Sequence, residues 1–429
     1  MRKKAPFEKR KRHIELPYGK EKISFHLPEG WEFKVLRPEP VPPSADPLKE
    51  VLRSLENPLE DKHLEDFGEA TSVAIAISDE TRPIPYPLLL PPLLEKLLNM
   101  GIRPSAIRIM IASGLHSPMP ESRFSNLLPM EIIKEYTVIA HDATRADLKF
   151  LGKTSRGTPV FVNPLFQSAE LRLIVGMIDP HQFVGYTGGV KGAAIGLAGA
   201  ETIEANHSML FHPQALIGEI EQNPVRQDIE EIGKMMDVHF VIDVVLEESN
   251  RIIKAFSGDP WAVEKVGSEF CRTVYEIKVP KEYDVVIASP GGYPKDINLY
   301  QAQKALAHAT PLVRQGGDTI LMAECLDGHG SELFYQTIRK YRSPHEVVED
   351  FQRNKFRMAV HKAFLWARSL IKAQIYLCSA LDETMIHGLM VLPAKNIQEA
   401  LERIGAKYVQ PPRVALIPKA SSTYVKLQA

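Results

Sequence analysis

Short apolar runs rich in β-branched residues recur along this chain and alternate with segments of helical periodicity. The runs are TSVAIAIS (71–78), AIRIMIA (106–112), TVIAHDA (137–143), LRLIVGMI (171–178), YDVVIAS (283–289), DTILMAE (318–324) and AQIYLCS (373–379). Segments between them, such as LLLPPLLEKLLNMG and NLYQAQKALAHAT, carry apolar residues at helical spacing. This alternation is typical of a parallel sheet covered by helices, because strands buried on both faces are apolar throughout. We therefore predict an α/β fold with largely parallel, Rossmann-like sheets.

The length of the chain predicts two domains, since 429 residues exceed the roughly 100 to 200 of one ordinary core. Helix and strand signals are mixed across 248–284 before a fresh strand begins, so we place the boundary within 272–282. We assign residues 1–275 to an N-terminal domain and residues 276–429 to a C-terminal α/β domain. KISFHLPEGWEFKVL (22–36) is expected to form an N-terminal hairpin.

Charge and cysteine content exclude several classes of protein. The 52 lysines and arginines nearly cancel the 53 aspartates and glutamates, which leaves no net field to attract nucleic acid or an anionic membrane. The three cysteines, Cys271, Cys325 and Cys378, form no CxxC pair, so neither a disulfide framework nor a zinc knuckle is indicated. The basic N-terminus is followed by no apolar stretch, and no run of about 18 apolar residues occurs. We expect a cytoplasmic protein.

Polar or glycine-rich loops follow five of the predicted strands directly. Their sequences are SDETRP, SGLHSP, HDAT, DPHQF and PGGYP. In open α/β sheets, ligands bind outside the carboxyl ends of the strands. The loops therefore predict one active cleft.

The segment GYTGGVKG (185–192) is the strongest single motif. Glycines before a helix N-terminus expose backbone N–H groups that suit a phosphate or a carboxylate, which makes Gly188 and Gly189 candidate binding residues. The motif is neither a Walker A loop, because no Ser or Thr follows Lys191, nor a GxGxxG turn. The alternative is a tight loop with a surface lysine.

Three histidines stand in special contexts: His116 in SGLHSP, His181 in DPHQF and His207 in ANHS. Imidazole ligates metals and serves as a general acid or base near neutral pH, although a lone histidine is usually structural. SDETRP adds Asp79 and Arg82, and the arginine offers a bidentate fork for a carboxylate. The alternative for this pair is a helix cap beside a surface arginine.

Polar residues also recur on a predicted helix in the C-terminal part. Tyr300 and Lys304 are four residues apart, with Gln301 three before Lys304, so the three can share one helix face. Such a stripe is usually only solvated. In AECLDGHGSE, His329 stands between glycines after a strand, where we expect it to support the site rather than to catalyse.

In their order along the chain, these motifs resemble the nickel-pincer lactate racemase family, and the resemblance covers nearly the whole sequence. It implies that Lys191 forms a thioamide link to a nickel-pincer nucleotide, nickel pyridinium-3,5-bisthiocarboxylic acid mononucleotide, and that His207 binds its nickel. Planar coordination that includes sulfur is reasonable for Ni(II). Gly188, Gly189 and Asp79 would contact or support the cofactor.

The resemblance also implies an isomerase that racemises or epimerises a 2-hydroxyacid in a cleft between the two domains. His116 and His181 would be the acid/base pair, because inversion in both directions needs a base on each side. Hydride would pass to the cofactor and return to the other face of a 2-oxoacid. Arg82 would bind the substrate carboxylate, and the C-terminal domain would add Tyr300, Gln301 and Lys304. The implied partners are the small-molecule substrate and cofactor-synthesis proteins.

The sequence departs from the family pattern at three places. Val190 and Ser117 stand where arginine is common, and AIG (194–196) stands where Pro-Gly often occurs. Loss of two charges predicts a substrate larger or more polar than lactate. Two other functions remain open: a zinc hydrolase that uses His116, His181 and His207, and a catalytically inactive nucleotide-binding regulator.

Overall fold

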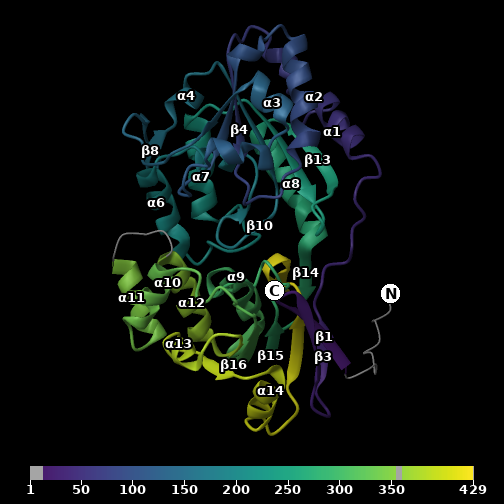
Figure 1. Cartoon of the computed structure of the whole chain (residues 1–429), viewed down its shortest axis with the longest axis vertical. Coiled ribbons are helices and arrows are strands. Elements are labelled where there is room, and N and C mark those ends of the chain that lie inside the picture. Colours follow the sequence, from purple (N-terminus) through teal and green to yellow (C-terminus); the bar gives the residue numbers. More distant parts are fainter. Residues whose placement is uncertain (1–12, 354–359, 429) are drawn as a thin grey trace. The chain divides into compact units, whose positions relative to one another are not determined.

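The computed structural model describes residues 13–353 and 360–428, which form two compact units (Figure 1). One unit comprises residues 39–275. The other comprises residues 13–38 together with 276–428. Each unit is built on its own six-stranded sheet with helices packed against it. In the described part of the chain, none of the helices combines the length and the apolar character needed to cross a bilayer.

The sheet of unit 39–275 has the strand order β13-β12-β9-β4-β5-β6. Its strands are β4 (Val73–Ser78), β5 (Ile107–Ala112), β6 (Thr137–Ala140), β9 (Leu171–Met177), β12 (Phe240–Leu246) and β13 (Ile252–Gly258). All neighbours are parallel except β12 and β13, which are antiparallel. β4, β9 and β12 are buried along almost their whole length, which explains their continuous apolar runs.

Helices cover this sheet on both faces. Alternate residues of β4, including Ile75 and Ile77, pack in one core with helices α1 (Pro47–Glu56) and α2 (Tyr86–Asn99). The opposite face holds the small residues Ala74 and Ala76, and it contacts the short helix α5 (Lys191–Ala194). A side chain at Gly192 would lie 2.6 Å from Ile174, so this close packing requires glycine. The sheet thus fixes the helix that starts at Lys191.

Three further helices in this unit carry polar residues of the site. They are α6 (Ala200–Ser208), α7 (Pro224–Met235) and α8 (Pro260–Tyr275). Helix α7 begins at Asn223, whose side chain accepts from the N–H groups of Val225 and Arg226, with Pro224 at the first helical position. The start of this helix is therefore encoded locally.

The other unit has an all-parallel sheet with the strand order β18-β17-β16-β15-β19-β3. Its strands are β3 (Glu32–Val35), β15 (Tyr283–Ala288), β16 (Val313–Met322), β17 (Ala373–Cys378), β18 (Leu392–Ala394) and β19 (Arg413–Ile417). Helices α9 (Leu299–Ala309), α12 (Val360–Lys372) and α14 (Ile397–Gly405) pack on it. The apolar runs at 283–289, 318–324 and 373–379 all coincide with strands.

The N-terminal segment differs from the sequence-based prediction. The hairpin is formed by β1 (His13–Tyr18) and β2 (Glu21–His26), not within 22–36, and β3 instead pairs in parallel with β19. Residues 13–38 therefore belong to the unit of the C-terminal part, whereas the prediction placed them in a domain of residues 1–275. Pairing between strands that are 381 residues apart, as Glu32 and Arg413 are, leaves no local sequence signal.

Candidate functional site

Four of the predicted site residues in unit 39–275 line one pocket near the carboxyl ends of β4 and β9: Arg82, Gly188, Gly189 and Lys191. The pocket opens at this edge beside the glycine-rich loop that follows the short strands β10 (Pro180–His181) and β11 (Gly185–Tyr186). All of the residues that line this pocket belong to unit 39–275. They include Ser78, Arg82, Thr187, Gly188, Gly189, Lys191 and Asp243. The loop after β4 thus meets the glycine-rich loop at the pocket, and it meets the loop after β5 through the contact of Asp79 with His116. The loop PGGYP lies in the other unit.

The turn at Gly188 and Gly189 can be built only from glycine. Their φ angles are +93° and +56°, in the region that side chains disfavour. A Cβ atom at Gly188 would lie 2.9 Å from Oδ2 of Asp243, and one at Gly189 would lie 2.9 Å from Cβ of Glu264. The N–H of Gly189 donates to Asp243 Oδ2 at 2.6 Å. The loop is therefore pressed against buried carboxylates.

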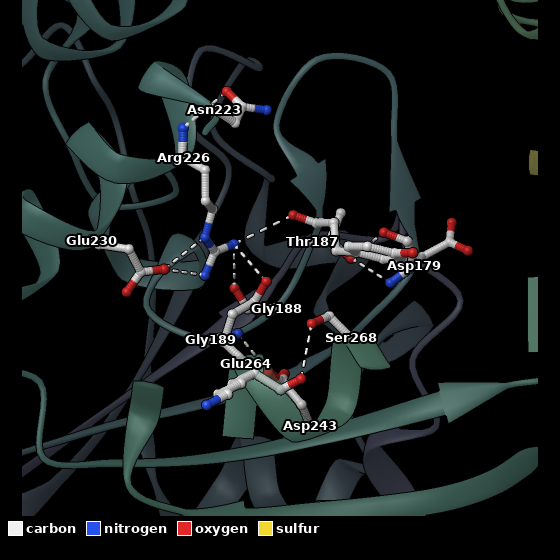
Figure 2. A network of polar contacts seen from close by, with 12 residues as sticks. Asp179, Thr187, Gly188, Gly189, Asn223, Arg226, Glu230, Asp243, Glu264 and Ser268 are labelled. Atoms are coloured by element: carbon white, nitrogen blue, oxygen red, sulfur yellow. Dashed lines mark hydrogen bonds and ion pairs between the residues drawn. The ribbon is translucent and has the colours of Figure 1, made fainter. Parts of the chain in front are cut away.

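A buried ionic network lies under this loop (Figure 2). Arg226 of α7 is fully buried and donates to the carbonyl oxygens of Tyr186 at 3.3 Å and Gly188 at 3.4 Å. Its guanidinium lies 3.1 Å from Glu264 of α8 and also pairs with Glu230. An arginine that binds both loop carbonyls and carboxylates fixes the loop in one conformation.

The carboxylates of this network have strongly perturbed acidities. Burial raises the pKa of Glu264 to about 8, against the opposing charge of Arg226. Burial likewise raises the pKa of Asp243 to about 7, although the Gly189 N–H and Arg226 oppose the shift. Sequence reasoning missed Arg226, Asp243 and Glu264. The one available signal was an aspartate in the middle of the buried strand FVIDVVL.

Lys191 begins α5 and lines the pocket. Burial, together with the positive charges of Arg82 and Arg226, lowers the pKa of its amine to about 7. A lysine of ordinary pKa is almost wholly protonated at neutral pH, whereas about half of this one is the free amine. The structure thus gives Lys191 the protonation state that a nucleophile requires.

His116 and Asp79 form a hydrogen-bonded pair beside the pocket. The Nδ1 atom of His116 lies 2.7 Å from Oδ2 of Asp79, and the imidazole is 58% exposed whereas the carboxylate is 11% exposed. Burial acts to raise the pKa of Asp79, but hydrogen bonds from His116 and Thr81 outweigh it and hold the pKa below its ordinary value. The carboxylate therefore accepts the Nδ1 proton, and Nε2 of the exposed ring is available to exchange protons.

His181 and His207 flank a common aromatic ring. Phe183 lies edge-on to both, with ring centroids 4.8 Å from His181 and 5.1 Å from His207. His207 lies near the end of α6, and its Nδ1 atom is 2.9 Å from Oδ1 of Asn206. The main-chain carbonyl of Phe183 accepts from Asn223, the N-cap of α7. The N-cap of α7 thus holds the backbone of Phe183, whose ring lies between His181 and His207.

The three histidines do not form a metal site by themselves. Within residues 13–353 and 360–428, no group of three His, Cys, Asp or Glu side chains is placed to hold a metal ion. A hydrolytic zinc site needs three protein ligands, so the zinc hydrolase alternative is not supported.

Comparison with known proteins decides the family. The chain matches the models of the lactate racemase N-terminal domain over residues 18–218 and of the lactate racemase C-terminal domain over residues 279–425. It is 31% identical over 424 residues to the lactate racemase of Lactiplantibacillus plantarum, covering 96% of this chain and 99% of that protein. The lactate racemase of Thermoanaerobacterium thermosaccharolyticum is 30% identical with the same coverage.

The chain belongs to the lactate racemase family. Its structure is similar to that of the lactate racemase apoprotein from T. thermosaccharolyticum, with a TM-score of 0.87 and 29% identity over 96% of this chain and 100% of that one. A Thermotoga maritima protein shares the fold, with a TM-score of 0.64 and 17% identity over 90% of this chain and 99% of that one. The resemblance and the two-part α/β fold are therefore confirmed, and the named relatives are isomerases that act on a hydroxy acid.

The departures from the lactate racemase pattern have different structural meanings. Val190 is fully buried and packs on α7, where a Cβ atom at Gly233 would lie 2.5 Å from Cβ of Val190. It is not among the residues that line the pocket. Ser117 is exposed in the loop after His116. Gly196, in the AIG segment, accepts through its carbonyl from the N–H of Gly114, which joins that loop to the segment after α5.

The remaining predicted residues of this lactate racemase family member lie in the other unit, on α9. Tyr300, Gln301 and Lys304 occupy its first two turns, and Asn298 caps the helix by accepting from the N–H of Gln301. The carbonyl of His329 accepts from the N–H of Tyr300. The carbonyl of His329 thus holds the start of α9.

Proposed function

We propose that this chain racemises or epimerises a 2-hydroxyacid at its hydroxyl-bearing carbon, with a nickel-pincer nucleotide held by Lys191 and His207. The observation that carries the proposal is the buried amine of Lys191 in a pocket that Arg82 also lines. The hydrogen-bonded residues Asp79 and His116 lie in the loops that follow β4 and β5, and Asp79 is next to Ser78, which lines the pocket. An anchoring amine, a carboxylate-binding cation and a proton-transferring imidazole are the groups that this chemistry requires.

The residues present fit the proposed group. The depressed pKa of Lys191 suits formation of a covalent link through its amine. Gly188 and Gly189 line the same pocket as Lys191, so the backbone of the loop lies beside the space that the group would take. His207 offers its imidazole for nickel, with Nδ1 directed at Asn206. When bound, the group would supply a hydride acceptor next to nickel.

The protein's own residues would bind the substrate and move protons. Arg82 would hold the substrate carboxylate by charge-assisted hydrogen bonds, each contributing about 1.5 to 3 kcal/mol. Nε2 of His116 would take the hydroxyl proton, while Asp79 stabilises the resulting imidazolium through Nδ1. His181 would perform the same step for the opposite enantiomer. The carboxylate of Asp79 hydrogen-bonds to His116 and to the hydroxyl of Thr81, so we propose that Asp79 supports the site through these two residues.

Tyr300, Gln301 and Lys304 remain our proposal for further substrate contacts, with Lys304 as a second cation for the carboxylate. Loading would require cofactor-synthesis proteins, which are the proposed macromolecular partners. The location that we propose is the cytoplasm. We propose lactate as the first substrate to test, since Val190 is buried and only Ser117 still argues for a larger acid.

The test is a panel of single enantiomers of lactate, malate, phenyllactate and gluconate, incubated in D₂O with cofactor-loaded protein. We expect optical purity to be lost for at least one acid without deuterium entering at C2, because the hydrogen returns as hydride. Deuterium at C2 would instead indicate proton abstraction from carbon and would contradict the mechanism. A loaded protein that leaves every acid optically pure would favour the inactive regulator.

A further inference from the structure

Helix α7 carries three fully buried polar side chains, and each binds a different part of the site. Asn223 donates to the carbonyl of Phe183, between the two imidazoles. Arg226 binds the loop before Lys191. Asp228 accepts from the side chain of Asn206, which contacts His207. The first two hold backbone, whereas the third reaches a functional imidazole through one intervening amide.

The path from Asp228 to His207 is a continuous chain of hydrogen bonds. Oδ1 of Asp228 accepts from the hydroxyl of Thr154 at 2.6 Å, and Oδ2 accepts from Nδ2 of Asn206 at 2.8 Å. Oδ1 of Asn206 lies 2.9 Å from Nδ1 of His207. Asp228 and Asn206 are both fully buried. Water therefore does not compete for these bonds, which strengthens them.

The partners of Asn206 determine which way its amide points. Nδ2 has two hydrogens, and these go to the carboxylate of Asp228 and, at 3.1 Å, to the carbonyl oxygen of Val225. Both of these groups only accept. The amide oxygen must therefore face His207, and an oxygen can only accept from Nδ1. The proton of a neutral His207 is thus placed on Nδ1, and the lone pair is placed on Nε2.

We propose that Asp228 is a positioning residue which, through Asn206, fixes His207 in its Nδ1–H form and so presents Nε2 to the nickel. This inference rests on the proposed function for the role of nickel, but not for the state of the ring. Outer partners that orient a metal-binding imidazole typically affect metal affinity by about 10-fold to 100-fold. We expect loss of Asp228 to have an effect of this size.

The first test concerns the ring alone and uses protein without cofactor. Long-range ¹H–¹⁵N spectra of ¹⁵N-histidine protein at about pH 8, where an ordinary imidazole is neutral, distinguish the two tautomers. A His207→Gln variant assigns the signal. We expect His207 in the Nδ1–H form in the wild type and in a mixture of both forms in Asp228→Leu. Glu231→Leu is the matched control, because Glu231 lies on α7 and binds the neighbouring Ser155 without any bond to Asn206.

The second test measures nickel retention in loaded protein by elemental analysis during dialysis against a chelator. We expect Asp228→Leu to lose nickel about 10-fold faster than the wild type or Glu231→Leu, with the organic adduct on Lys191 unchanged in mass. If circular dichroism shows that Asp228→Leu folds poorly, the Asn206→Leu variant is used in its place, because it removes the same link to His207. A wild-type protein without any adduct or nickel would refute the proposed function, while the spectra would still decide the state of the ring.

Two results would overturn the inference. One is an Nε2–H ring in the wild type, or an Nδ1–H ring that persists in both Asp228→Leu and Asn206→Leu. The other is a changed tautomer with wild-type nickel retention, since Asp228 would then set the ring without any benefit to the metal.

Discussion

His116 and His207 lie in the same unit and use the same ring atom differently. Nδ1 of His116 faces the carboxylate of Asp79 directly at 2.7 Å, on an exposed loop. Nδ1 of His207 faces the amide of Asn206 at 2.9 Å, and a carboxylate stands only behind that amide. A carboxylate stabilises the charged imidazolium, whereas an amide orients the ring without adding a full charge. The first arrangement suits proton transfer, and the second suits a neutral metal ligand.

This difference supports the separate roles that we propose for the two histidines. It also explains why α7 matters, because Asp228 sets the second arrangement while the first depends only on the turn after β4.

The contrast has functional meaning only if Lys191 anchors the cofactor for both imidazoles. We expect Lys191→Ala to lose all detectable racemisation and all covalent adduct while remaining folded, because a buried amine adds little to a core. Racemisation assays and intact mass measure the two losses. Lys234→Ala, at a lysine of α7 that packs on Trp261, is the control and should retain both. Activity near that of the wild type in Lys191→Ala would remove the anchor from the mechanism.

Alanine variants of the two histidines should fail in different ways. We expect His116→Ala to keep its nickel and to lose about 10²-fold to 10⁴-fold in kcat, as for a lost general acid or base. His207→Ala should lose nickel and keep the organic adduct, because Lys191 still holds it. Elemental analysis of both loaded variants separates the two outcomes. Nickel loss from both, or from neither, would erase the contrast.

Replacing the carboxylate by an amide makes the His116 pair resemble the His207 pair. We expect Asp79→Asn to lower kcat by about 10-fold to 100-fold, because the imidazolium loses its counter-charge but keeps a hydrogen-bond partner. Nickel content should not change. Because hydrogen bonds hold the pKa of Asp79 below its ordinary value, the stabilisation it provides is present at neutral pH and disappears as the pH falls through that lowered pKa. An unchanged kcat would show that His116 does not need the charge.

The smallest expected effect is on the pH dependence of stability, and it arises from Glu264 in the buried ionic network under the glycine-rich loop. With its pKa raised to about 8, folded Glu264 retains a proton that the unfolded chain releases above its ordinary pKa of 4.5. Stability therefore falls as the pH rises between these values, by at most about 1.4 kcal/mol per pH unit for one proton. Glu264→Gln should flatten the decline in the thermal midpoint of cofactor-free protein between about pH 5 and pH 7. Equal slopes in Glu264→Gln and wild type would contradict the shift. Glu231→Gln is the control, because Glu231 binds Ser155 and lies outside the buried network.

Local patterns predicted much of the fold and suggested several site residues, which stay a proposal. Continuous apolar runs predicted the strands, and His116 and Lys191 stood out because glycines or strand ends surround them. Sequence reasoning misplaced β3, because its partner β19 is remote in the chain. It missed Arg226, Asp228 and Glu264, because a charged residue on a helix predicts a solvated face unless its buried partner is known. The contact of Val190 with α7 at Gly233 likewise shows only in the packing.

The proposed function depends most directly on whether Lys191 carries the covalently attached cofactor. Intact mass followed by peptide mapping of protein produced together with cofactor-synthesis proteins measures it. We predict an adduct of mononucleotide size on the peptide that contains Lys191, with nickel present in equal amount, and no adduct in Lys191→Ala. Active protein with an unmodified Lys191 would contradict the account.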